Sequence, residues 1–269
     1  MKILKLLKRY IKYLARAKTK YNIHSPFVYD LITKVMEDRT DYPVYSDVRE
    51  LKISLFRNSN PVETIDFGAG SKAFPYSTRI RKINKIARQT EQPDKIAHLL
   101  FRIVKHFKPN TILELGTSLG ISSIYFSDAS PQGKITTIEG CASVASEAQN
   151  NFNKLGLRNI KVLIGNFDTI LPRYLKKNDN LDFVFFDGNH RKEPTLKYFN
   201  ACLPKANENS IFVFDDIHWS EGMEEAWETI KKNTKVTVTI DLFYMGIVFF
   251  KKDIAKQDII LKLKKFAVI

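Results

Sequence analysis

The chain has 269 residues, of which 44% are hydrophobic and 19 are Phe, so it can bury a sizeable core and is not disordered as a whole. Its longest apolar runs are far too short to cross a bilayer. The basic N-terminal segment lacks the continuous apolar stretch and cleavage site of a secretion signal. Two cysteines without paired spacing indicate neither a disulfide framework nor a zinc site. We therefore expect a cytoplasmic protein.

The net charge of +14 is concentrated at the two ends of the chain. Residues 1–20 contain eight Lys or Arg and no acid, and residues 251–265 contain six Lys and two Asp. The middle of the chain is nearly balanced. The sequence therefore does not predict a basic nucleic-acid-binding face over a catalytic core.

Apolar residues recur at helical spacing in the first segment and predict a basic amphipathic helix. The apolar positions are Ile3, Leu6, Leu7, Tyr10, Ile11 and Leu14. Three partners fit such a helix: an anionic membrane surface, RNA, or the protein itself. We favour the last, in which the apolar stripe packs on the domain or on a partner subunit, because amphipathic helices most often serve a core.

The sequence then leads to the central region through further helices. Ser25 followed by Pro26 predicts a helix start, and residues 27–57 read as one or two helices. The run Asp66–Gly70 looks like a cofactor turn, but neither a second strand nor a terminal acid follows it, so we predict a loop. Apolar spacing over residues 96–107 predicts a helix before the first core strand.

The central stretch, residues 111–140, reads as strand, tight glycine turn, helix and second strand. The apolar run at 112–115, broken only by Glu114, is typical of a buried parallel strand. Gly116 and Gly120 bracket a turn in which the backbone bends sharply and lets a ligand approach closely. Such a turn offers N–H groups at a helix N-terminus to a polar or anionic ligand.

The second strand of this unit, at 135–138, ends in Glu139. In a right-handed strand–helix–strand unit this acid lies beside the first turn. It can there accept two hydrogen bonds from a ribose. The pattern therefore predicts a nucleotide-containing cofactor.

Two cofactor classes use this arrangement. A dinucleotide fingerprint needs glycine at 118 and 121, where the chain has Ser118 and Ile121. The run ELGTSLGIS instead resembles the first motif of class I S-adenosylmethionine (SAM) methyltransferases, especially their O-methyltransferase branch. The resemblance implies that Glu114 supports the methionine end of SAM and that Glu139 binds the ribose hydroxyls. It also implies cofactor contacts from the turn itself, namely Gly116, Thr117, Ser118 and Gly120.

Polar residues also follow the later strands. A third strand at 160–164 leads to Asn166, which either caps the next helix or, as the resemblance implies, bonds the adenine. A fourth strand ends at Asp187 and a fifth at Asp215 and Asp216. Because ligands of open α/β sheets bind at the carboxyl ends of strands, we expect these acids to converge. They would repel one another unless a cation lay between them, and Mg²⁺ prefers such oxygen ligands. The alternative is that one or two of the acids cap the following helices.

The run Asp187-Gly-Asn-His190, with Asp215-Asp216 later, resembles metal-dependent O-methyltransferases of the catechol and macrocin types. The resemblance implies that Asp187, Asp215 and Asp216 hold Mg²⁺ and that Asp187 also lies at the cofactor. It further implies that His190 accepts the proton of the substrate hydroxyl. The catechol type usually has Asp-Asn where this chain has Asp215-Asp216.

We therefore predict the Rossmann-like α/β fold of class I methyltransferases, with a seven-stranded, mostly parallel sheet and an antiparallel last strand. The predicted segments are a helical N-terminal extension at 1–92, serving as a lid, substrate or dimer element, a SAM-binding domain at 93–252, and a basic tail at 253–269. The run NIHSPFVYDLITKV resembles the N-terminal extension of a bacterial subgroup of these enzymes.

The expected function is methyl transfer from SAM to a hydroxyl oxygen of a small molecule, with a homodimer as a candidate assembly. One alternative is an RNA or other nucleic-acid methyltransferase that uses the basic termini. Amino-directed base methylases of this fold, however, carry Asn/Asp-Pro-Pro-Tyr/Phe after the fourth strand, and an acidic rim repels phosphates. The other alternative is a non-catalytic module that binds SAM, or a membrane through residues 1–20.

Overall fold

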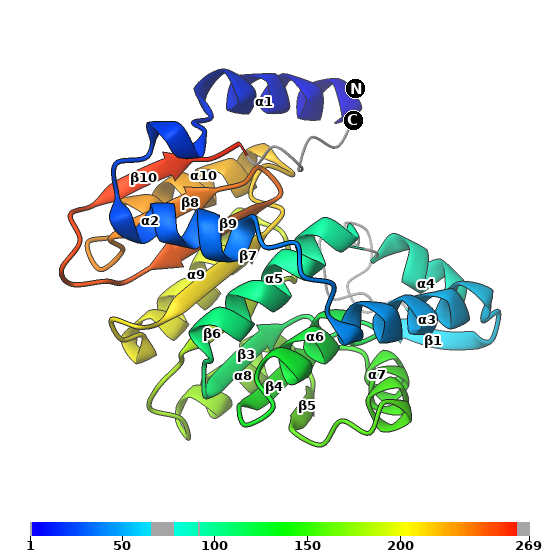
Figure 1. Ribbon diagram of the computed structural model, residues 1–269. Coiled ribbons are helices and arrows are strands. Elements are labelled where there is room, and N and C mark those ends of the chain that lie inside the picture. Colours follow the sequence, from blue (N-terminus) through cyan, green and yellow to red (C-terminus); the bar gives the residue numbers. More distant parts are fainter. Residues whose placement is uncertain (1, 66–77, 91, 263–269) are drawn as a thin grey trace. The chain divides into compact units, whose positions relative to one another are not determined.

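The computed structural model describes residues 2–65, 78–90 and 92–262 and falls into two compact units (Figure 1). One unit comprises Met1–Met36 with Leu175–Ile269, and the other comprises Glu37–Tyr174. The loop predicted at Asp66–Gly70 lies outside the described residues. Among the helices that the structure describes, none is long and apolar enough to cross a bilayer.

The unit Glu37–Tyr174 contains a parallel sheet of three strands in the order β3-β4-β5. Its elements confirm the predicted central strands and helices, because each apolar run and each glycine turn falls where the sequence placed it. They are β3 (Thr111–Leu115), α6 (Ile121–Ala129), β4 (Lys134–Glu139), α7 (Ala142–Lys154) and β5 (Ile160–Ile164), preceded by α5 (Asp94–Phe107) and followed by α8 (Phe167–Leu175).

Two helices and a hairpin precede this sheet. They comprise α3 (Pro43–Arg57), β1 (Pro61–Ile65), β2 (Thr78–Lys82) and α4 (Ile83–Gln89), with β1 and β2 antiparallel. The prediction that no second strand follows β1 was wrong. The sequence of β2, TRIRK, has a single apolar residue and is mostly exposed, so it lacks the alternation by which half-buried strands are recognised.

The other unit contains five strands in the order β10-β8-β9-β7-β6. Strand β9 is antiparallel to both neighbours, whereas β6 is parallel to β7 and β10 is parallel to β8. Every residue of β6, β8 and β9 is buried, as in a sheet covered on both faces. The strands are β6 (Phe183–Phe186), β7 (Ile211–Asp215), β8 (Val238–Asp241), β9 (Met245–Phe249) and β10 (Gln257–Ile260).

The helices of this unit come from both ends of the chain. They are α1 (Lys2–Arg16), α2 (Pro26–Leu31) with a continuing π-helix (Ile32–Met36), α9 (Lys192–Cys202) and α10 (Glu221–Lys232), with short 3₁₀ helices at Lys20–Asn22 and Leu203–Lys205. The predicted cap is confirmed, since the Ser25 hydroxyl accepts the Val28 N–H and Pro26 opens α2.

The α/β class and the mostly parallel arrangement are confirmed, with one strand more than predicted. Apart from the β1-β2 hairpin, the two units contain eight strands, whereas we predicted seven. The additional strand is β10, which lies inside the segment that we predicted as a basic tail. Its pairing with β8 explains the difference, because three of the four residues of β8 are apolar or β-branched and supply a buried edge that Gln257–Ile260 completes. The boundaries predicted at residues 92 and 252 stay predictions.

Candidate functional site

The glycine turn between β3 and α6 has the backbone that its sequence predicts. Gly116 and Gly120 have positive φ angles of 108° and 85°, and Ser118 also lies in the left-handed region at 49°. A Cβ on Gly120 would collide with the ring of Phe152, so both the backbone and the packing require glycine here. The turn therefore holds a fixed shape at the start of α6.

Glu139 lies beside this turn, as predicted from its place at the end of β4. Its Oε2 accepts the Ser118 N–H at 2.9 Å, and its Oε1 accepts the Cys141 N–H at 2.9 Å. Burial raises the pKa of Glu139, and the backbone N–H donors oppose this rise. The acid thus joins the glycine turn to the start of α7.

Glu114, in β3, is fully buried, with 0% of its surface exposed. Its two oxygens accept the hydroxyls of Ser122 and Ser123, in the first turn of α6. Burial raises the pKa of Glu114 to about 7, against the lowering effect of these hydroxyls and that of Thr137. The carboxyl group therefore fixes the helix that follows the turn.

Two further residues predicted at the cofactor have structural contacts. The hydroxyl of Thr117 lies 2.6 Å from that of Thr137, and both side chains are buried. Asn166 precedes α8, and its Oδ1 accepts the Asp168 N–H at 2.8 Å, so it caps this helix as one of our two interpretations expected. Its contact with adenine stays a prediction.

In the other unit, the parallel register of β6 and β7 aligns their carboxyl ends. Phe186 pairs with Phe214, so Asp187 and Asp215 follow at neighbouring strand ends. Asp187, His190 and Asp215 each offer one ligand atom, and these atoms lie within 4.8 Å of one another. The His190 Nε2 is 3.5 Å from the Asp187 Oδ1. Two carboxylates and one imidazole at this spacing are a candidate cation site.

Asp216, predicted as a third metal ligand, is not in this group. It has a positive φ of 55°, and its N–H donates to the Tyr244 carbonyl at 2.6 Å. Burial raises the pKa of Asp215 well above its usual range, and the charges of Asp187 and Asp216 add to this rise. The three acids thus oppose one another's ionisation, as expected of carboxylates that share a site.

A family model described as a methyltransferase domain matches residues 113–217. The matched range begins in β3 and ends just after β7, so it contains the glycine turn, Glu139, Asp187 and Asp215. This match over residues 113–217 supports the expected class I SAM-dependent methyltransferase family. The predicted α/β fold is confirmed.

Among known proteins, this chain is similar to catechol O-methyltransferases. That of Niastella koreensis is 31% identical over 109 residues, which cover 39% of this chain and 48% of the relative. That of Mus musculus is 29% identical over 156 residues, covering 49% of this chain and 59% of the relative. The chain thus spans about half the length of the curated relatives that it matches.

A solved structure has the same fold over most of the chain. The S-adenosylhomocysteine-bound methyltransferase PaMTH1 of Podospora anserina has a TM-score of 0.59 at 13% identity, covering 85% of this chain and 97% of that protein. At this identity the likeness concerns the fold alone.

The sequence did not identify several residues that hold the candidate cofactor site together. The hydroxyls of Ser122 and Ser123 bind Glu114, and the Thr90 hydroxyl lies 3.1 Å from that of Ser118. The spacing of the two serines from Glu114 suits a strand and the helix that follows it, and this is the signal by which they could have been found. Nothing in the sequence around Thr90 points to the turn.

Proposed function

We propose that this protein is a SAM-dependent O-methyltransferase that uses a divalent cation and acts on a hydroxyl group of a small molecule. The observation that carries the proposal is the grouping of Asp187, His190 and Asp215 at the ends of two adjacent parallel strands. The similarity to catechol O-methyltransferases supports oxygen as the acceptor atom and makes a catechol the first acceptor to test.

The cofactor half of the proposal concerns the glycine turn. Glu139, which the N–H groups of Ser118 and Cys141 hold beside the turn, would accept the ribose hydroxyls. Backbone groups of the turn would face the methionine end, and Asn166 would lie near the adenine. Glu114 would act indirectly, because its contacts with Ser122 and Ser123 position the helix after the turn.

The residues present fit a divalent cation. Carboxylate ligands suit Mg²⁺ or Mn²⁺, and a positive ion would relieve the repulsion that raises the pKa of Asp215. Asp187 and Asp215 would hold it, with Asp216 close behind in the chain. When bound, such an ion supplies the charge that lowers the pKa of an acceptor hydroxyl.

The reaction moves a methyl group from the sulfonium sulfur of SAM to the acceptor oxygen. The carbon–sulfur bond breaks as the carbon–oxygen bond forms, and the products are a methyl ether, S-adenosylhomocysteine and one proton. His190 would receive that proton on its imidazole. Its Nε2 lies 3.5 Å from the Asp187 Oδ1, so the imidazole is next to a carboxylate that would hold the cation.

Calorimetric titration with S-adenosylhomocysteine, followed by transfer of radiolabelled methyl from SAM to catechol with Mg²⁺ or with EDTA, tests the proposal. We expect Glu139→Ala to lower the affinity for S-adenosylhomocysteine at least about tenfold, since hydrogen bonds to charged groups contribute about 1.5–3 kcal/mol each. Glu50→Ala, an exposed glutamate on α3, is the matched control. Absence of S-adenosylhomocysteine binding in the wild type would refute the proposal. A rate of methyl transfer that EDTA does not change would refute the role of the cation in the proposal.

A further inference from the structure

Helix α1 packs on its own unit with one face. Tyr10 and Tyr13 are buried against Phe243, with ring centroids 4.8 Å and 5.3 Å from its ring. The Tyr13 hydroxyl donates to the Leu261 carbonyl at 2.5 Å. Leu6, Leu14 and Ala17 pack against the same cluster. These residues therefore mark the face of α1 that packs against the core of its unit.

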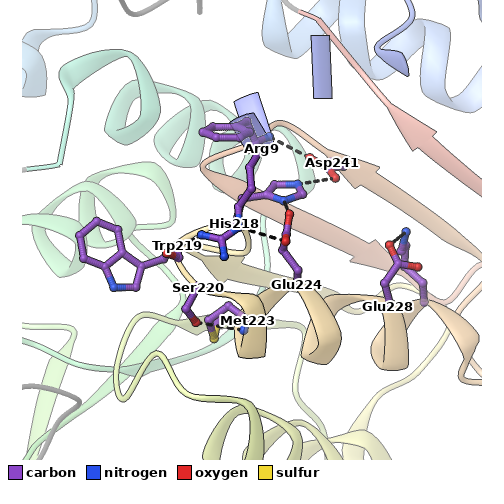
Figure 2. A network of polar contacts seen from close by, with 10 residues as sticks. Arg9, His218, Trp219, Ser220, Met223, Glu224, Glu228 and Asp241 are labelled. Carbon is purple, nitrogen blue, oxygen red and sulfur yellow. Dashed lines mark hydrogen bonds and ion pairs between the residues drawn. The ribbon is translucent and has the colours of Figure 1, made fainter. Parts of the chain in front are cut away.

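Polar contacts fix the rotation of the helix, as Figure 2 shows. The Arg9 Nε donates to the Glu224 Oε2 at 3.1 Å, and its Nη1 donates to the Trp219 carbonyl at 3.3 Å. Glu224 also bonds His218 Nδ1 at 2.8 Å, while His218 Nε2 lies 2.9 Å from Asp241 Oδ2. This chain of contacts links α1 to α10 and to the end of β8, so α1 cannot turn over without breaking it.

The expected apolar stripe is consequently divided between two faces. Leu6, Tyr10 and Leu14 face the unit, but Leu7 and Ile11, which we predicted in the same stripe, are exposed. The exposed fractions are 64% for Leu4, 44% for Leu7 and 58% for Ile11. These three residues, at spacings of three and four, form one outward row that we call the outer stripe.

Positive charge borders the outer stripe. Lys5, Lys8 and Lys12 are all exposed on the next rows of the helix, and the chain contains no acid before Asp30. An aliphatic row beside a lysine row on a helix that is only fifteen residues long is the pattern of a helix that lies in a membrane interface.

We propose that the outer stripe of α1 binds the surface of an anionic lipid bilayer, with Leu4, Leu7 and Ile11 among the acyl chains and the lysines at the headgroups. A second copy of the chain fits less well, because a twofold contact would bring two lysine rows together. RNA fits less well too, because its phosphates contact basic side chains and its bases stack on aromatic ones. The aliphatic side chains of the outer stripe would then have no contact with it. The inference does not depend on the proposed methyl transfer.

Flotation with vesicles of phosphatidylglycerol and phosphatidylcholine, compared with pure phosphatidylcholine, tests this assignment. We expect binding to the anionic vesicles only, and release at high salt. The double variant Leu7→Glu/Ile11→Glu should bind about a hundredfold less, since it removes two buried aliphatic side chains. Lys5→Gln, Lys8→Gln and Lys12→Gln should each cost about fivefold.

Two controls make the result specific. Ile53→Glu changes an isoleucine of similar exposure, 43%, on α3, and should leave vesicle binding unchanged. Equal thermal melting of the variants would show that the fold is intact. No binding of the wild type to anionic vesicles at low salt would overturn the proposal. So would self-association by sedimentation velocity that Leu7→Glu/Ile11→Glu abolishes, or RNA binding that survives this change.

Discussion

Both oxygens of Glu139 accept backbone N–H groups of their own unit, whereas desolvation and the neighbouring carboxylates Asp187 and Asp216 raise the pKa of Asp215. In the first case the protein itself supplies the positive ends of dipoles that balance a buried charge. In the second, neighbouring acids oppose ionisation, and His190 lies within the same group. The first carboxylate receives its balancing donors from the protein, while the second gains most from an added cation.

The largest effect expected from this difference concerns Asp187. Asp187→Asn keeps the size of the side chain but removes a charged ligand, so we expect affinity for Mn²⁺ or Mg²⁺ to fall about a thousandfold. Even the substitution of residues that only hydrogen-bond to a metal ligand typically lowers metal affinity 10–100-fold. Titration calorimetry with each ion measures this. S-adenosylhomocysteine affinity should stay within about twofold of the wild type if the two sites are built independently.

Asp253→Asn, an exposed aspartate of the same unit, controls for a general loss of negative charge. Equal metal affinity in Asp187→Asn and the wild type would mean that the acids serve the fold rather than an ion.

The next effect concerns Glu114, a buried acid balanced by hydroxyls rather than by N–H groups. Its pKa of about 7 lies above the usual 4.5, so the folded state holds its proton more tightly than the unfolded state does. Stability should therefore fall as pH rises from about 4.5 to 7, by up to about 3 kcal/mol. Glu114→Gln cannot ionise and should be more stable than the wild type above that window, and equal to it below.

Chemical denaturation across this pH range measures the difference in the free energy of unfolding between the two proteins. A constant difference at all pH values would show that Glu114 does not titrate in this window.

The smallest effect tests how rigid the glycine turn is. Gly120→Ala meets both a left-handed backbone and the Phe152 ring, whereas Gly156→Ala meets a positive φ of 67° with open space around the new Cβ. Overpacking costs about 1–3 kcal/mol beyond the backbone strain that both variants share. Gly120→Ala should therefore lose about 2 kcal/mol more than Gly156→Ala in thermal or urea unfolding. Equal losses of stability in the two variants would show that the turn moves to accommodate the new Cβ of Gly120→Ala.

The sequence predicted the elements around the glycine turn well because local rules determine them. Apolar runs set β3 and β4, and Gly116 and Gly120 supply the positive φ angles that join β3 to α6. Strand β2 escaped prediction because it is mostly exposed, and β10 because its four residues lie in a lysine-rich segment. These two strands depend on their partners rather than on their own pattern.

The candidate cation site was predicted in part for the same reason. Asp187 and Asp215 follow from the rule that parallel strands end at one edge, but the place of His190 rather than Asp216 beside them depends on the loop after β6 and the left-handed backbone of Asp216. The hydroxyls that hold Glu114 likewise depend on how α6 packs on β3. Tertiary contacts, not local patterns, decide these details.

The unit that receives α1 joins the first residues of the chain to the last. Lys18 exchanges backbone hydrogen bonds with Ile260 and Lys262, and Tyr10 packs on Phe243. During synthesis at about 5–20 residues per second, α1 leaves the ribosome roughly 10–50 seconds before these partners are made. Glu37–Tyr174 is complete long before then. Until these last strands are made, both apolar faces of α1 therefore lack the partners that cover one of them in the folded unit.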